Sequence, residues 1–127
     1  AADLYSRALA GARSNLASAP QNLVILVLCL SGRARCLAEM GRARGNLSAN
    51  EKLIQAASSE ARAAAALAKR CVPSSTEESM VLMMESIAHA FVAADQADEA
   101  VIVLKDALCK NAKNEEELFA VVKKLRK

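Results

Sequence analysis

Aromatic side chains are scarce in this chain. It has no tryptophan, one tyrosine and two phenylalanines among its 127 residues. Proteins that bind single-stranded nucleic acid stack the bases on such side chains, so their scarcity disfavours nucleic acid as a partner. The net charge of +3 is also too small for a dedicated nucleic-acid-binding face.

Long apolar runs are also missing. The longest one extends from Leu23 to Leu30, a run of eight residues. A membrane-spanning helix needs about 20 apolar residues. The sequence therefore predicts no membrane segment, and we expect no membrane partner.

The residue patterns of catalysis and of metal or phosphate binding are not found either. The sequence contains no glycine-rich phosphate loop and no nucleophile elbow. His89 is the only histidine, and neither a cysteine nor a second histidine stands at metal-ligand spacing from it. We therefore predict a protein that is not an enzyme, binds no cofactor or metal and takes no small-molecule substrate.

The four cysteines form no Cys-x-x-Cys pair. Cys29 and Cys36 are seven residues apart, which is about 10 Å along a helix and too far for a disulfide. We expect all four to be free, buried thiols that act as small apolar side chains. Free thiols are typical of a reducing compartment, so we expect the cytoplasm or the nucleus.

Glycine and proline are rare, at four and two residues, whereas alanine fills more than a fifth of all positions. This composition favours helix almost throughout. We predict one all-α domain over residues 1–127 with about six helical segments. The segments run from Ala1 to about Ala17, Pro20 to about Arg44, Ser48 to about Arg70, Ser74 to about Ala94, Ala97 to about Lys110, and from Asn114 onward.

Short sequence signals mark the ends of these segments. Pro20 suits a first helical turn. Ser48 and Glu51 form a capping box, in which each side chain binds a free amide of the first turn. Thr76 lies among hydroxyl and acidic residues that suit another helix start. Asn114, with a glutamate three residues later, is the predicted N-cap of the last helix.

One pattern of small and large residues occurs three times. It consists of an alanine, a large residue four positions later, an alanine three positions further on and an adjacent apolar residue. Helix backbones approach closely where the residues are small, and the large residue fills the groove of a neighbour. The three instances, which start 48 and 51 residues apart, are Ala1-x3-Tyr5-x2-Ala8-Leu9, Ala49-x3-Leu53-x2-Ala56-Ala57 and Ala100-x3-Leu104-x2-Ala107-Leu108.

Two further segments suit the preceding helix of a hairpin. They are Leu30-x3-Ala34-x2-Leu37, with a turn expected at Gly41, and Met84-x2-Ile87-Ala88-x2-Phe91, with a turn at Asp95-Gln96. With these segments the chain resembles the tetratricopeptide repeat family, closely over residues 81–112 and in part over 27–57. Arg33 departs from that pattern, because the family has a large apolar residue there.

This resemblance implies antiparallel helical hairpins stacked as a tetratricopeptide-like superhelix. The last segment carries one apolar stripe at Leu118, Val121, Val122 and Leu125, and its polar remainder suits a capping helix. The segment at Ala1 has no partner helix before it, so we expect the chain to be a fragment of a longer repeat protein.

The resemblance also implies a function and a binding site. The first helix of each hairpin would line a concave groove that binds a peptide or a partner helix, so we expect a non-enzymatic scaffold for protein interactions. The family's clamp of lysines and asparagines for chaperone tails has no counterpart here. The predicted partner-binding residues are Leu28, Ser31 and Arg35 in the earlier hairpin and Leu82, Glu85, His89 and Val92 in the later one.

Two other functions stay open. The chain could be a structural subunit packed permanently in a larger complex, which an exposed apolar stripe between Leu23 and Leu30 would favour. It could also be an alanine-rich helical-bundle adaptor in which Ser58 to Ala66 packs closely against neighbours. The packing order of the helices separates a stacked array from a closed bundle.

Overall fold

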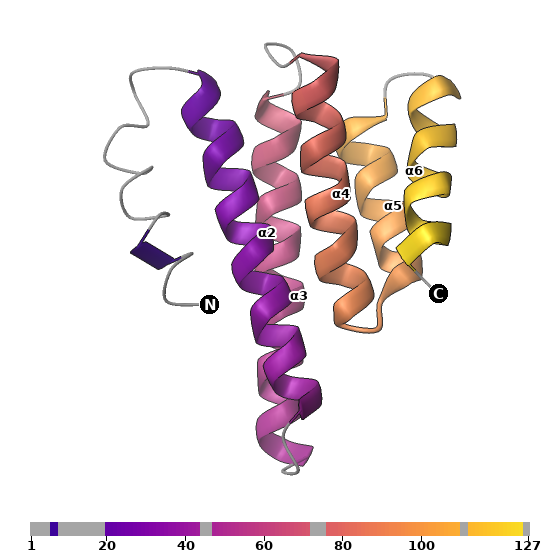
Figure 1. The fold of residues 1–127 in the computed structure, drawn as a ribbon. Coiled ribbons are helices and arrows are strands. Elements are labelled where there is room, and N and C mark those ends of the chain that lie inside the picture. Colours follow the sequence, from indigo (N-terminus) through magenta and orange to yellow (C-terminus); the bar gives the residue numbers. More distant parts are fainter. Residues whose placement is uncertain (1–5, 8–19, 44–46, 72–75, 110–111, 126–127) are drawn as a thin grey trace.

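The computed structural model describes residues 6–7, 20–43, 47–71, 76–109 and 112–125. These residues form five helices and no strand, so the prediction of an all-α fold is confirmed. The first predicted segment lies outside the described residues, apart from Ser6 and Arg7, which are helical. The helices are α2 (Pro20–Ala43), α3 (Leu47–Cys71), α4 (Glu77–Ala93), α5 (Ala97–Leu108) and α6 (Ala112–Leu125) (Figure 1).

The helix ends follow some of the predicted signals and not others. Thr76 caps α4, because its side-chain oxygen accepts a hydrogen bond of 3.1 Å from the amide of Ser79. Helix α3 begins at Leu47, one residue before the predicted cap Ser48. Helix α6 begins at Ala112, so Asn114 is a buried residue of its first turn and the prediction of an N-cap there is wrong.

The turn between α4 and α5 lies where the sequence predicted it. Asp95 has a φ of 60°, the left-handed conformation that favours glycine. The amide of Gln96 donates to the carbonyl of Phe91 at 2.8 Å, and the amide of Asp95 donates to that of Val92 at 3.0 Å. These two bonds define a Schellman motif, which ends α4 and lets the chain reverse.

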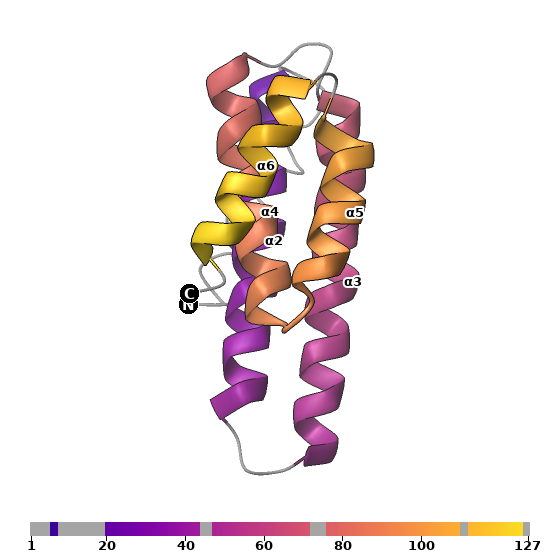
Figure 2. The same cartoon turned by 90° about the vertical axis from the view of Figure 1, so that its right-hand side faces the viewer.

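The helices lie in two layers. One layer contains α2, α4 and α6, and the other contains α3 and α5, as Figure 2 shows from the side. Consecutive helices run in opposite directions (Figure 1). Each helix from α4 onward packs against the two helices that precede it in the chain: α4 on α2 and α3, α5 on α3 and α4, and α6 on α4 and α5.

The core between the layers combines large side chains with alanines. The largest fully buried side chains include Phe91, Met83 and Met84 of α4. Facing them, α3 contributes a stripe of buried alanines that allows close helix approach. The eight residues that carry the repeat pattern in α4 and α5 are all buried, namely Met84, Ile87, Ala88, Phe91, Ala100, Leu104, Ala107 and Leu108.

Gly41 was expected to form a turn, and this expectation is wrong. Gly41 lies within α2, which continues to Ala43. A Cβ atom at Gly41 would lie 3.1 Å from the carbonyl oxygen of Asn50 and 3.1 Å from Cγ1 of Ile54. The glycine therefore allows α2 and α3 to approach closely near the end of their hairpin.

Candidate protein-binding face

A buried polar contact joins the two helices that carry the predicted binding residues. The hydroxyl of Ser31 on α2 donates to the carbonyl of Val27 at 2.8 Å and also bonds to the hydroxyl of Ser86 on α4. A mid-helix serine is satisfied by the carbonyl one turn earlier, so it can be buried at little cost. Ser31 is fully buried, and the expectation that it lines a free surface is therefore wrong.

Leu28 and Arg35 lie one turn to either side of Ser31, on the edge of α2 that faces α4. Leu28 is half-buried, whereas Arg35 is exposed and forms an ion pair of 3.0 Å with Glu39. Because Ser31 between them contacts α4, this edge of α2 borders the outer face of α4.

On α4 the outer stripe begins with two exposed residues. Leu82 is 53% exposed, and Glu85 follows it one turn later. Val92 is half-buried at the far end of the helix, where it lines an open hollow of about 610 Å³ together with Arg42 and Leu125. The predicted site residues of α4 therefore extend from the exposed apolar side chain of Leu82 to the polar hollow beside Val92.

His89 is the point at which the two helices influence each other electrostatically. It is half-buried, and burial is the main cause that lowers its pKa from the usual 6.5. The positive charge of Arg35 lowers the pKa further, and the negative charge of Glu39 opposes this shift. Burial and Arg35 therefore favour the neutral form of the imidazole. We call the surface formed by Leu28, Arg35, Glu39, Leu82, Glu85 and His89 the α2–α4 face.

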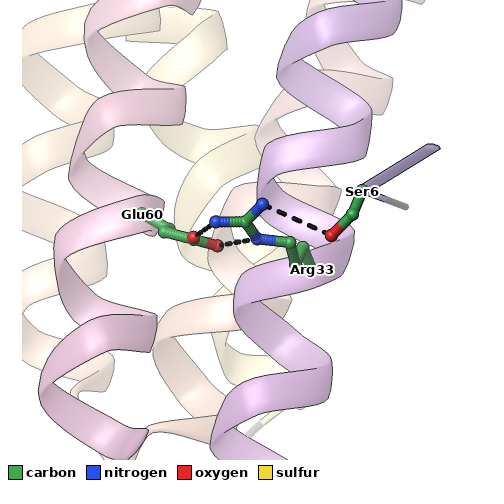
Figure 3. A network of polar contacts seen from close by, with 3 residues as sticks. All are labelled: Ser6, Arg33 and Glu60. Carbon is green, nitrogen blue, oxygen red and sulfur yellow. Dashed lines mark hydrogen bonds and ion pairs between the residues drawn. The ribbon is translucent and has the colours of Figure 1, made fainter. Parts of the chain in front are cut away.

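Two arginines near this face have structural partners within the chain. Arg33 donates from Nε to Glu60 of α3 at 2.9 Å, its second guanidinium nitrogen binds the other carboxylate oxygen, and a third contact reaches Ser6 at 3.4 Å (Figure 3). Arg42 donates to the carbonyl of Ala93 at 3.3 Å, at the end of α4. These side chains connect helices, whereas Arg35 is exposed and pairs with Glu39 of its own helix.

The cysteines are all free thiols, as the sequence predicted. Cys29 and Cys71 are buried, while Cys36 and Cys109 are half-buried. Burial raises the pKa of Cys29, Cys71 and Cys109, so these thiols are poor nucleophiles. Within the described ranges no group of three histidine, cysteine or acidic residues could hold a metal ion.

None of the described helices is both long enough and apolar enough to cross a bilayer.

One apolar surface was not predicted from the sequence, and it lies at the other end of the helix array. Ile102 of α5 is 66% exposed and Phe119 of α6 is 52% exposed. Phe119 lies outside the apolar stripe of α6, so the side of this helix that was expected to be polar carries a large aromatic residue. The sequence did carry a signal for this surface, namely apolar residues at adjacent positions, as in Val101 to Val103 and at Leu118 and Phe119. Two adjacent residues cannot both lie on the buried face of one helix, so one of them is expected to be exposed.

Comparison with protein-family models, with curated proteins and with solved structures finds no match to this chain. The resemblance to tetratricopeptide repeats therefore rests on its residue pattern alone.

Proposed function

We propose that this chain is a non-enzymatic scaffold for protein interactions and that the α2–α4 face binds a peptide or a helix of a partner protein. The observation that carries the proposal is the convergence of two separate helices at this face. Ser31 of α2 and Ser86 of α4 are joined by a hydrogen bond although they are 55 positions apart in the sequence. The charges of Arg35 and Glu39 on α2 also act on the imidazole of His89 on α4.

The packing order of the helices supports a stacked array as the architecture of this scaffold. Each helix from α4 onward packs on the two preceding helices, as in proteins built from stacked helical hairpins. The alternative of an alanine-rich closed bundle would instead need extensive packing of α2 against the last helices. The helix pairs with the most extensive packing do not include α2 with α5 or α6.

The chemistry of the face suggests what it would bind. Leu82 offers an exposed apolar contact, Glu85 adds a negative charge, and the exposed ion pair of Arg35 with Glu39 adds one charge of each sign. A partner segment with an apolar anchor and flanking charges of both signs would complement this surface. The four free thiols fit a reducing compartment such as the cytoplasm or the nucleus.

A permanent structural subunit is less well supported. An exposed apolar stripe between Leu23 and Leu30 would favour such a role. Within this run Leu26, Val27, Cys29 and Leu30 are buried in the core, and Ile25 is the exposed large residue. The run therefore serves the core of this domain rather than an interface with a larger complex.

Affinity capture from a cell extract with matched variants tests the proposal. The test variant combines Glu85→Lys and His89→Glu, two substitutions one turn apart on α4. The control variant combines Glu51→Lys and Gln55→Glu, which have the same spacing and the same change in charge on exposed positions of α3. We expect a bound protein that the test variant loses and the control variant retains, with equal helicity in circular dichroism. Equal capture by both variants would refute the proposed face.

A further inference from the structure

The apolar surface between α5 and α6 is an open groove of about 740 Å³. It is lined by Asp98, Val101 and Ile102 of α5 and by Phe119, Val122 and Lys123 of α6. Its two most prominent side chains, Ile102 and Phe119, are 66% and 52% exposed. Large apolar side chains that face water together on two neighbouring helices typically mark a site of association.

The position of this groove follows the packing order of the array. Helix α5 occupies the space formed by α3 and α4, and α6 occupies the space formed by α4 and α5. The groove is the corresponding space formed by α5 and α6, one step further in the same direction. Ion pairs fix α6 beside it, with Lys113 and Glu77 of α4 at 3.2 Å and Lys105 of α5 and Glu115 at 3.7 Å. The groove therefore lies where the packing order of α5 and α6 would place the next helix.

We propose that this groove binds one amphipathic helix of a partner protein. The bound helix continues the layer of α3 and α5 and runs antiparallel to α6, as each helix of the array runs antiparallel to the one before it. Its apolar stripe covers Ile102 and Phe119. This site is separate from the α2–α4 face and does not depend on it.

Charges at the rim of the groove define the chemistry of the partner further. The neighbours α3 and α5 are joined at their surface by two ion pairs with a seven-residue spacing, Arg62 with Glu99 at 3.2 Å and Lys69 with Asp106 at 3.3 Å. At the groove, Lys123 lies on the α6 side, where Lys124 adds a second positive charge to the last turn. An acidic residue on the flank of the partner helix that faces α6 would pair with Lys123.

A synthetic helical peptide tests this site directly. The probe is a fluorescein-labelled peptide of about 16 residues, with leucine and alanine in an i, i+3, i+4, i+7 stripe and glutamate along one flank. Its binding is measured by fluorescence anisotropy, and a scrambled peptide of the same composition serves as the negative control. The protein variants are Ile102→Lys and Phe119→Lys in the groove, with Ile25→Lys of α2 as the matched control. Ile25 is 47% exposed and Phe119 52%, and Ile25 lies neither in the groove nor in the α2–α4 face.

We expect the designed peptide to bind and the scrambled one not to bind. Each groove variant should weaken binding at least about tenfold, because a central apolar contact is replaced by a charge. The Ile25→Lys control should bind as the unchanged chain does, and Lys123→Glu should weaken binding by up to about fivefold, as for an exposed ion pair.

Three results would overturn the proposal. The designed peptide could fail to bind, or it could bind the groove variants and the unchanged chain equally well. Alternatively, sedimentation could reveal a dimer of the chain that Phe119→Lys dissociates, which would mean that a second copy covers the groove. All variants change exposed side chains, and their helicity is checked by circular dichroism before binding is measured.

Discussion

Arg33 of α2 and Glu60 of α3 form an ion pair in which two guanidinium nitrogens bind the two carboxylate oxygens. Their side chains are only 31% and 17% exposed. The tetratricopeptide pattern has a large apolar residue at the position of Arg33. In this chain a paired charge takes that place between α2 and α3. Such a pair has a defined orientation, because the planar guanidinium matches the carboxylate geometry.

Removing one partner of this pair should destabilise the fold. The change Glu60→Ala leaves the half-buried guanidinium of Arg33 without its carboxylate, at an expected cost of about 1 to 2 kcal/mol. Urea unfolding followed by circular dichroism measures this cost. The control is Glu39→Ala, which removes the exposed partner of Arg35 and should cost less than about 0.5 kcal/mol. Equal losses from both changes would show that the Arg33 pair adds no more than a surface contact.

A glycine at position 95 should stabilise the chain. Asp95 adopts a φ of 60° at the end of α4, where glycine carries no steric cost, and its negative charge lies at the negative end of the helix dipole. We expect Asp95→Gly to increase the free energy of unfolding by about 0.5 to 1 kcal/mol and to raise the thermal midpoint. The control, Asp98→Gly, places glycine inside the first turn of α5 and should destabilise by about 1 kcal/mol. A lower midpoint for Asp95→Gly would contradict the assignment of the turn.

Local signals in the sequence predicted the parts of the fold that depend on local interactions. The composition was enough to predict the five described helices, Thr76 to predict the start of α4, and Asp95-Gln96 to predict the turn between α4 and α5. Gly41 and Asn114 were misassigned because each is common at a helix end but is used here inside a helix. At Gly41 the reason is contact with α3, which a helix-ending signal does not encode.

The candidate site was less predictable, because its residues are placed by contacts between helices. Helical spacing put Leu28, Ser31 and Arg35 on one stripe, but it could not show that this stripe borders α4. Ser31 was expected outside because of its place in the hairpin pattern, whereas its bond to a carbonyl one turn earlier allows burial. The exposure of Phe119 was missed because hydrophobicity alone does not distinguish a core position from an open groove.

Enlarging Ala100 should test the close approach of α5 to its neighbours. Ala100 is fully buried, so the extra atoms of Ala100→Leu would force the surrounding core apart. We expect a loss of about 1 to 3 kcal/mol in the free energy of unfolding, measured by urea denaturation. The matched control is Ala63→Leu at an exposed position of α3, with an expected change within about 0.5 kcal/mol. An unchanged unfolding midpoint for Ala100→Leu would remove the evidence for tight packing at this residue.

The titration of His89 should reveal the electrostatic link between α2 and α4. Because it is the only histidine, its ring proton signals in an NMR titration are unambiguous. Burial and Arg35 lower its pKa from 6.5, so we expect a midpoint below that value. Arg35→Ala should move the midpoint up towards 6.5, and Glu39→Gln should move it further down. A midpoint at or above 6.5 in the unchanged chain, or one that neither substitution shifts, would contradict this arrangement.

The same lowered pKa predicts how the stability of the fold depends on pH. Below about pH 6.5 an unfolded chain protonates His89 while the folded chain still holds it neutral. The unfolded state then binds more protons, so the stability contributed by this residue is complete above pH 6.5 and decreases as the pH falls towards the folded pKa. Urea unfolding at several pH values should therefore show a weaker dependence on pH in this range for His89→Gln than for the unchanged chain. An identical dependence in both would mean that burial of this imidazole does not affect folding.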